Sequence, residues 1–361
     1  MIEIFECPGN EAAEWNRFVS GHIRSTYAHR YEMKTVIEKT YGNKTVYLCA
    51  REDGKMAAVF PLVIMPGFRG GKSFVSVAYN SYGGILRSGG DEAEIRRAFL
   101  GYIRGKYPEC ATIEERSIAW EEDDYHSDGC PTAEATTSGA ITSEVTMICD
   151  ISEFSAPDRF LGKVDGKKRN QIRKGMKQGF ASSWDKGLLG RLYEIYLVNM
   201  GAKGTPVHPV GLYENILESF GDDCELLTVL DKGKVVGGFI GIRHNGMFTT
   251  LMASVLSEYN ALCANDFLYW EGITHAIETR LSFFDFGRSE AGSGTYRFKK
   301  QWATRQYRLN YTRYKADGSP LAGTSMKAYR GGWGKLFSSL WKKAPLAAQR
   351  RLGPGIRRFM P

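Results

Sequence analysis

Residues 285–302 read DFGRSEAGSGTYRFKKQW. The apolar run Leu281 to Phe286 leads into this stretch and predicts a buried strand that stops at Gly287. An arginine and a serine follow, then a Gly-Ser-Gly turn and an aromatic, basic run. Proteins of the α/β class often place their chemistry where strands end, so we expect a functional site here. The alternative is a polar loop followed by an edge strand.

Length and composition bound the class of protein. A chain of 361 residues is longer than one hydrophobic core usually serves, so two domains are expected. The net charge of +8 favours polyanionic partners such as RNA, nucleotides or phospholipid headgroups. Seven cysteines without a C-x-x-C pair argue against a disulfide framework and a zinc site, and no metal is expected. We expect a cytoplasmic protein, because the N-terminus is not a signal peptide and no apolar run could span a bilayer.

The order helix, helix, hairpin, strand, helix, strand is predicted twice along the chain. In the second copy these elements are Leu188–Gly201, Val210–Phe220, a hairpin over Cys224–Arg243, Met247–Val255, Asn265–Thr279 and Leu281–Phe286. In the first copy the helices are Glu11–Ser20, Tyr31–Thr40 and Asp91–Lys106, and the strands are Thr45–Arg51, Met56–Met65 and one around Ala111–Glu115. This weak internal repetition predicts two domains built on one plan.

Composition shifts suggest four segments. These are an N-terminal domain over residues 1–150, a basic linker over 151–180, a C-terminal domain over 181–320 and a basic amphipathic tail over 321–361. The segment Glu121 to Ser143 is rich in acidic and small polar residues and predicts a surface loop in the first domain.

Five features occur in a fixed order over roughly residues 10 to 315. They are Trp15 with Phe18 and Tyr41-Gly42 before a hairpin with Phe60-Pro61-Leu62, the loop Tyr82-Gly83-Gly84, the run Lys168 to Lys174, Asn265 with Leu268 and Trp270, and Asp285 to Arg288 followed by Gly294 to Lys299. Together they resemble the FemAB family of non-ribosomal aminoacyl and acyl transferases, whose catalytic half looks like a GNAT-type acyltransferase domain. The likeness is greatest to the branch associated with exopolysaccharide and exosortase systems.

The resemblance implies an α/β fold of two tandem GNAT-like domains, each a mixed, mostly antiparallel sheet flanked by helices. It also implies a cleft in or beside the second domain. Two departures leave the donor open between acyl-CoA and aminoacyl-tRNA. The helical arm that some tRNA-using members insert is absent, and the Gly-rich pyrophosphate loop of GNAT enzymes is replaced by LSEYNALCAN at residues 256–265. No tightly bound cofactor is expected.

Three residues are candidates for catalysis. The resemblance implies that Lys299 contacts the reacting carbonyl or a donor phosphate, where a cation would stabilise the oxyanion; the alternative is a solvated lysine on an edge strand. Tyr296 is a candidate general acid, although an aromatic packed on a strand is the favoured interpretation. Asp285, inside an apolar run, would act as a base with a raised pKa or would fix Arg288.

Other polar residues are candidates for binding. Donor phosphates are assigned to Arg288, Ser289, Asn265, Arg169 and Arg173. The alternative for Arg288 is an ion pair with Asp285 or Glu290. Asn265 is also predicted to cap its helix. The alternative for the basic run around Arg169 and Arg173 is a solvated helix face. Tyr79, Asn80 and Tyr82 are candidates for lining an acceptor groove, or else belong to a packed loop.

The tail carries an apolar stripe of Trp333, Leu336, Phe337, Leu340 and Trp341 among lysines and arginines. Such a helix lies on an anionic membrane or packs its stripe on the second domain. The sequence thus predicts an acyl or aminoacyl transferase that acts on an amine of an envelope polysaccharide or peptidoglycan-type precursor, lipid-linked ones included, with tRNA and the inner-membrane surface as further partners. A non-catalytic RNA- or membrane-binding protein and an ordinary acetyltransferase are the rival classes.

Overall fold

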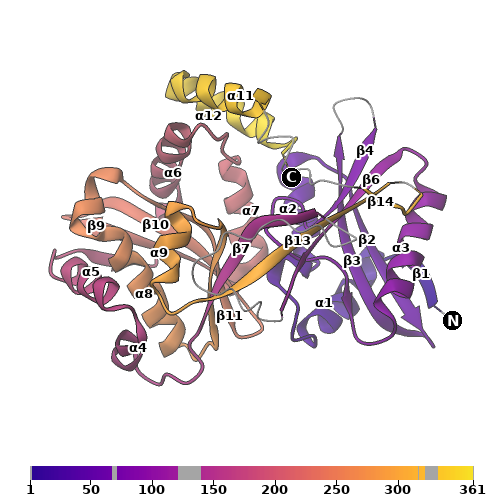
Figure 1. Cartoon of the computed structure of the whole chain (residues 1–361), viewed down its shortest axis with the longest axis horizontal. Helices are drawn as coiled ribbons and strands as arrows, with labels where there is room; N and C mark the ends of the chain where they lie inside the picture. The colour runs from indigo at the N-terminus through magenta and orange to yellow at the C-terminus, as the bar shows by residue number, and fades with distance from the viewer. Residues whose placement is uncertain (1, 67–70, 121–139, 316, 322–331, 361) are drawn as a thin grey trace. The chain divides into compact units, whose positions relative to one another are not determined.

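The structure is a computed structural model that describes residues 2–66, 71–120, 140–315, 317–321 and 332–360 (Figure 1). The chain divides into two compact units. Unit 1 comprises Met1–Ser143, Arg308–Gly331 and Arg357–Pro361, and unit 2 comprises Glu144–Tyr307 and Gly332–Ile356. The last strand of unit 1 is therefore formed by a segment that comes after the whole sheet of unit 2 in the sequence.

The sheet of unit 1 has its strands in the order β1 (Ile2–Glu6), β2 (Thr45–Glu52), β3 (Lys55–Pro66), β4 (Lys72–Ser76), β6 (Cys110–Ile118) and β13 (Arg305–Lys315). The short strands β5 (Leu86–Arg87) and β14 (Pro320–Leu321) pair with β3 and β13. Neighbouring strands are antiparallel except β4 and β6, which are parallel. The helices are α1 (Ala12–Ser20), α2 (Glu32–Tyr41) and α3 (Glu92–Lys106).

Both faces of this sheet are covered, because its strands alternate two sets of apolar side chains. Phe99 of α3 packs on Phe60, with ring centroids 5.6 Å apart. Trp15 of α1 packs on Tyr47, with centroids 4.9 Å apart. Each contact belongs to a separate buried cluster, so one sheet supports two cores.

The sheet of unit 2 has its strands in the order β7 (Ala140–Asp150), β12 (Phe283–Glu290), β11 (Met247–Val255), β10 (Lys234–His244), β9 (Cys224–Asp231) and β8 (Ala181–Ser183). Its parallel pair is β11 with β12. The helices are α4 (Pro157–Lys163), α5 (Gly166–Met176), α6 (Leu189–Lys203), α7 (Val210–Phe220), α8 (Ala264–Glu278) and α9 (Gly294–Lys300). Helix α8 packs closely on the sheet, since a Cβ on Gly272 would lie 2.5 Å from Phe239.

The two units share one plan. In each, antiparallel strands lead into a helix that returns to a strand parallel to the preceding one: β4–α3–β6 in unit 1 and β11–α8–β12 in unit 2. A pair of helices comes directly before the hairpin in both units, α1 and α2 in unit 1 and α6 and α7 in unit 2. The predicted repeat of two mixed, mostly antiparallel domains is confirmed.

Three segments differ from the sequence-based expectations. Residues 151–180, expected as a linker, carry α4 and α5, and Phe160 and Ile172 are part of the core of unit 2. The loop expected over Glu121–Ser143 ends earlier, because β7 begins at Ala140, while residues 121–139 lie outside the described residues. The aromatic, basic run after the Gly-Ser-Gly turn forms helix α9 instead of a strand.

The described part of the tail, residues 332–360, forms the helices α11 (Gly332–Lys343) and α12 (Leu346–Arg357). Trp341 is buried, with 7% of its surface exposed, and α11 packs on α6. The predicted helix is therefore confirmed, and one of its sides is fixed to unit 2. Within the described residues, no helix is both long and apolar enough to cross a membrane.

Candidate functional site

A bulge in β12 lies at the centre of the candidate site. The strand does not stop at Gly287, as the sequence suggested; its pairing with β7 shifts between Asp285 and Arg288 and then resumes. Gly287 has a φ of +74°, a conformation that glycine adopts without strain. A Cβ at this position would lie 3.2 Å from the carbonyl oxygen of Thr250. The glycine therefore bends the strand instead of ending it.

Lys299 of α9 is bound to this bulge. Its Nζ donates to the carbonyl oxygens of Gly287 at 2.8 Å and Arg288 at 3.0 Å, and only 7% of the residue is exposed. Burial lowers the pKa of Lys299 to about 8, against the attraction of Asp285. A protonated lysine has three N–H donors, and the two carbonyls use two of them. Within the described residues no third acceptor is found, so one donor remains for a ligand.

Asp285 holds the bulge in shape. It is fully buried and accepts hydrogen bonds from Thr146 Oγ1 at 2.7 Å and from the backbone N–H of Gly287 at 2.8 Å. Arg288 forms an ion pair with Glu144 of β7, with 3.6 Å between Nε and Oε2, a partner that the sequence had not suggested. Two cations and two carboxylates thus surround one backbone bulge.

Two further candidates lie near this cluster in the chain. Tyr296 is on α9, and its hydroxyl donates to Gln306 Oε1 at 2.9 Å. Ser293 begins this helix by accepting from the backbone N–H of Tyr296 at 3.2 Å. Ser289 is 4% exposed, and its Oγ has no hydrogen-bond partner within the described part of the chain. A buried hydroxyl without a partner is a group that a ligand can satisfy.

Lys168 of α5 supports the helix that carries Lys299. Its Nζ lies 2.5 Å from Asp266 Oδ1 and 4.0 Å from the ring centroid of Phe298. Burial lowers the pKa of Lys168, against the attraction of Asp266. In this run, which the sequence suggested for phosphate capture, Arg169 is half-buried and donates to Gly162 O at 3.3 Å, whereas Arg173 is exposed. Lys168 is therefore structural, and Arg173 stays accessible.

The start of α8 differs from the prediction at Asn265. The helix begins at Ala264, and the residue before it, Cys263, has a φ of +58° and gives no side-chain cap. Helix α5 packs closely here, since a Cβ on Gly175 would lie 2.8 Å from the carbonyl oxygen of Cys263. Uncapped N–H groups attract anions, and the basic run of α5 lies beside them. This helix start is therefore a candidate phosphate position.

Residues 166–300 match a family described as an acetyltransferase (GNAT) domain. Over this matched segment, unit 2 has a GNAT-like fold. The match extends from α5 to α9 and includes the bulge, Lys168 and Lys299. The chemistry of this domain class is acyl transfer. Among curated proteins, no significant sequence match is found.

Solved structures show the same fold over most of the chain. The crystal structure of FemX is 15% identical, with a TM-score of 0.63, and the match covers 85% of this chain and 96% of that one. A tandem GNAT protein from the clavulanic acid biosynthesis pathway is 10% identical, with a TM-score of 0.53 and coverage of 88% and 99%. The C-terminal domain of a putative lysylphosphatidylglycerol synthetase from Agrobacterium fabrum is 12% identical, with a TM-score of 0.52 and coverage of 84% and 91%. At such identities the likeness shows the fold, and it agrees with two tandem GNAT-like domains.

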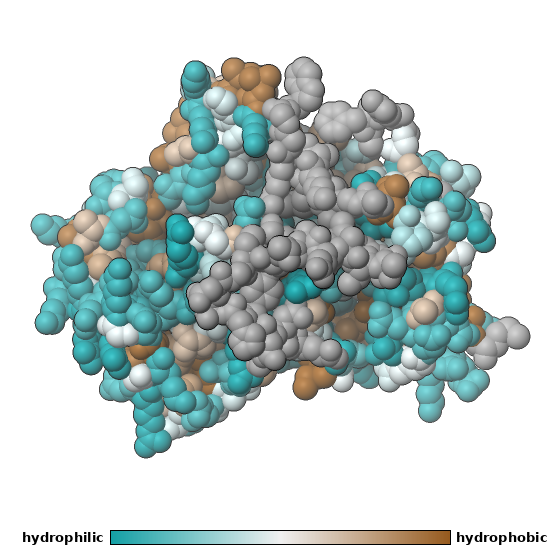
Figure 2. Space-filling model, viewed as in Figure 1, coloured by the Kyte–Doolittle hydropathy of each residue, from teal (hydrophilic) through white to brown (hydrophobic). Residues whose placement is uncertain are grey.

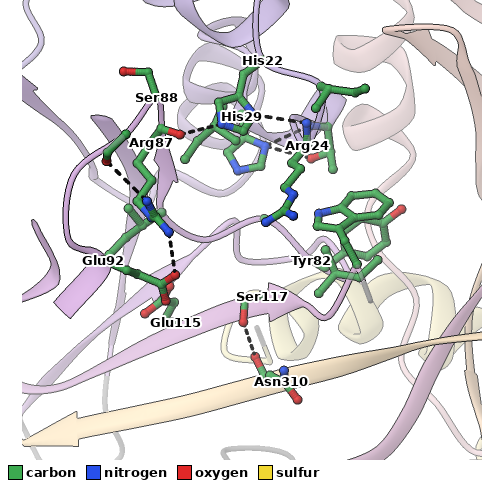
Figure 3. A pocket seen from close by; sticks show the side chains of 18 residues that line it. His22, Arg24, His29, Tyr82, Arg87, Ser88, Glu92, Glu115, Ser117 and Asn310 are labelled. Carbon is green, nitrogen blue, oxygen red and sulfur yellow. Dashed lines mark hydrogen bonds and ion pairs between the residues drawn. The ribbon is translucent and has the colours of Figure 1, made fainter. Parts of the chain in front are cut away.

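Outside the GNAT domain, unit 1 contains a cavity of about 460 Å³ (Figure 3). Tyr82 and Trp120 form an aromatic wall, with ring centroids 6.3 Å apart. The guanidinium of Arg24 extends into the cavity, whereas Arg87 lies 3.4 Å from Glu92. Cavities with aromatic walls and a few directed polar groups are typical of small-molecule sites.

The three predicted acceptor residues lie in different places. Tyr82 lines the cavity. The hydroxyl of Tyr79 accepts from Asn43 Nδ2 and donates to the carbonyl of Arg358, both at 2.7 Å. The side chain of Asn80 accepts from the Tyr27 hydroxyl at 2.8 Å. Tyr79 and Asn80 therefore stabilise the loop. Arg24 and Trp120 also line the cavity but were not predicted, because no motif in the neighbouring sequence distinguishes them.

Gly287→Ala is expected to destabilise unit 2 by about 2 kcal/mol, because alanine tolerates a positive φ poorly and its Cβ would approach Thr250 O. Gly292→Ala is the matched control. Gly292 also has a positive φ, of +77°, but a Cβ there would meet nothing within 4 Å. Urea unfolding of both variants checks this. Equal losses of stability would show that the close contact beneath the bulge has no effect.

Stability is expected to rise between about pH 8 and 10.5 through Lys299. Its pKa is about 8 in the folded chain and near its ordinary 10.5 when unfolded, so the unfolded state binds more protons in this window. Raising the pH through this window therefore increases the free energy of unfolding, by about 3 kcal/mol at most. The measurement is the difference in unfolding free energy between wild type and Lys299→Met across this window. A constant difference would mean that Lys299 titrates alike in both states.

Proposed function

We propose that the protein transfers an acyl or aminoacyl group from an activated donor to an amine, and that unit 2 performs the chemistry. The observation that carries this proposal is the buried ammonium of Lys299 in a GNAT domain, held by two backbone carbonyls with one donor left over. Such a fixed cation in a nearly dry site suits a position where negative charge develops.

In the proposed reaction, the amine nitrogen attacks the donor's carbonyl carbon. The carbonyl oxygen becomes an oxyanion, and the free N–H of Lys299 donates to it. The C–S or C–O bond to the carrier then breaks, the amide forms, and the proton lost by the amine ends on the leaving carrier. Tyr296 is proposed as the acid that delivers this proton. Asp285 and Glu144 keep Lys299 and Arg288 charged and in place, which is a positioning role.

The donor is proposed to be acyl-CoA or aminoacyl-tRNA, both of which carry phosphates. Their proposed contacts are the start of α8 at Asn265, the basic side of α5 with Arg169 and Arg173, and Arg288 with Ser289. Exposure of Arg173 and the buried, unpartnered Oγ of Ser289 support this assignment.

The acceptor is proposed to be an amine of an envelope polysaccharide or peptidoglycan-type precursor, including lipid-linked forms. The cavity of unit 1 supports this, because an aromatic wall at Tyr82 and Trp120 suits the apolar face of a sugar, while Arg24 suits an acidic substituent. Tyr79 and Asn80 would act only through the loop that carries Tyr82. The exosortase-associated branch remains a proposal about the pathway in which this acceptor is made, and the cytoplasm is the proposed compartment.

A non-catalytic RNA-binding protein is the second candidate. The observation that favours it is the exposed basic side of α5, where Lys167, Arg173 and Lys174 all face solvent. Phosphate contacts of this kind give binding that weakens steeply with salt and needs no turnover.

Melting temperatures with a panel of ligands test the proposal. The panel holds acetyl-CoA and longer acyl-CoAs, charged tRNA, and nucleotide sugars. A true donor at 100 times its dissociation constant stabilises the fold by about 2.7 kcal/mol, and the melting temperature should rise accordingly. No rise with any acyl-CoA or charged tRNA would contradict the transferase. A rise with charged and uncharged tRNA alike, lost at high salt, would favour the RNA-binding alternative.

A further inference from the structure

One side of the tail is fixed to unit 2. Helix α11 packs so closely on the end of α6 that a Cβ on Gly204 would lie 2.3 Å from Ser338 Oγ. The buried Gln349 of α12 donates to the carbonyl oxygens of Trp341 and Ala344, both at 2.9 Å. Arg350 forms a bidentate ion pair with Glu194 of α6. The two helices therefore form one anchored element.

The other side of the tail exposes large apolar side chains. Exposed fractions are 51% for Leu336, 62% for Leu340, 40% for Leu346 and 54% for Leu352. Leu336 and Leu340 are four residues apart, so they share one stripe of α11, and this stripe lies roughly 120° around the helix from the buried Trp341. Figure 2 shows hydrophobic side chains at the upper margin of the view, where α11 and α12 lie in Figure 1, beside hydrophilic ones. Packing on α6 thus does not account for these leucines. The side chain of Trp333, also predicted for the stripe, lies outside the described side chains.

The charge of the tail indicates what covers this surface. Residues 332–356 contain Lys335, Lys342, Lys343, Arg350 and Arg351 and no acidic residue, in a chain whose net charge is +8. Lys343 follows Leu336 by seven residues and so lies next to the leucine stripe. A second copy of the chain would bring the same positive charge to this surface and be repelled. An anionic surface with an apolar interior satisfies both the lysines and the leucines.

We propose that α11 and α12 bind the surface of an anionic lipid bilayer. The leucines enter the boundary between headgroups and acyl chains, and the lysines contact the acidic headgroups. Each helix has 12 residues and so a length of about 18 Å, which fits an element lying in the plane of the interface. This binding does not depend on acyl transfer, although it would bring the protein to lipid-linked acceptors.

Co-sedimentation with vesicles tests the proposal. The full chain should sediment with vesicles of phosphatidylcholine and phosphatidylglycerol and much less with phosphatidylcholine alone. Leu336→Ser with Leu340→Ser should weaken binding by at least about 10-fold, because two apolar side chains are no longer transferred from water into the membrane interface. Lys343→Gln, which removes the charge beside the leucine stripe, should reduce the preference for the acidic lipid. Lys342→Gln should reduce it less, because the side chain of Lys342 packs at Gly204 on the anchored side of α11. Val198→Ser, on α6 and 42% exposed, is the control and should bind as wild type does.

Three outcomes would overturn the proposal. One is unchanged binding of the leucine variant when its melting temperature matches that of wild type. Another is equal binding to both kinds of vesicle. The third is a wild-type dimer by light scattering that the leucine variant dissociates, without any vesicle binding, which would make a second copy the occupant. An inactive protein that still binds vesicles in the predicted way would reject the transferase and leave this inference standing.

Discussion

Lys299→Met is expected to lower the rate of acyl transfer by about 10²- to 10³-fold, the loss typical of removing one donor to an oxyanion. Methionine is apolar and similar in length, so it fills a position that is only 7% exposed. It cannot donate to the developing negative charge or to the carbonyls of Gly287 and Arg288. The measurement is the rate of amide formation with the donor that raises the melting temperature, followed by mass spectrometry.

Lys300→Met is the matched control for this prediction. Lys300 is the next residue of α9 and is exposed, so the same change there removes a charge from the helix but not from the bulge. Its transfer rate should stay within about twofold of wild type, since exposed lysines contribute little. Similar losses in both variants would mean that the net charge of α9 matters and the pocket at the bulge does not.

Asp266→Ala is expected to destabilise the chain by about 3–5 kcal/mol, because it leaves the ammonium of Lys168 buried without its counter-charge. The side chains of the pair are 2% and 9% exposed. Lys168→Met combined with Asp266→Leu should recover most of the loss, since well-packed apolar residues can replace a buried ion pair at little cost. Urea unfolding at neutral pH gives the free energies of unfolding of wild type, Asp266→Ala and the double variant.

The exposed pair of Lys163 and Glu153 provides the comparison. Its side chains are 62% and 64% exposed, and Glu153→Ala should change stability by less than about 1 kcal/mol. If Asp266→Ala cost no more than Glu153→Ala, or if the double variant Lys168→Met/Asp266→Leu were no more stable than Asp266→Ala, Lys168 would not be held as the structure indicates. The claim that Lys168 stabilises the helix carrying Phe298 and Lys299 would then be wrong.

Local patterns predicted most of the fold. The hairpin turns and the helical periodicity placed Val210–Phe220 and Met247–Val255 at their observed bounds. Their signals are local, since turn residues and apolar spacing act within a few residues. The order of these elements was enough to indicate two domains on one plan.

The errors occur where long-range packing outweighs a local signal. Gly287 has the sequence pattern of a strand end, but β7 pairs with both sides of the bulge and continues the strand. Residues 294–300 carry two aromatic side chains and a threonine, which suggested a strand. A helix of 7 residues has little stability of its own, so its packing decides the outcome. The one local indication of a helix was Ser293, since serine is favoured at the N-cap position.

The candidate site was partly accessible from the sequence. Lys299, Asp285 and Arg288 were found because they follow one another along a short stretch. Their partners were not, because Glu144 lies on a strand more than 100 residues earlier and Asp266 is 98 residues from Lys168. The cavity of unit 1 combines residues from 22 to 310, and no local spacing could have assembled it.

The dependence of the transfer rate on pH, measured for wild type and Lys299→Arg, tests the central claim most directly. If the protonated side chain of Lys299 stabilises the oxyanion, the wild-type rate should fall above about pH 8, where this ammonium loses its proton. Arginine keeps its charge beyond pH 12, so the slower Lys299→Arg enzyme should show no such fall. Superimposable profiles for the two proteins, or a Lys299→Met variant as fast as wild type, would contradict the account.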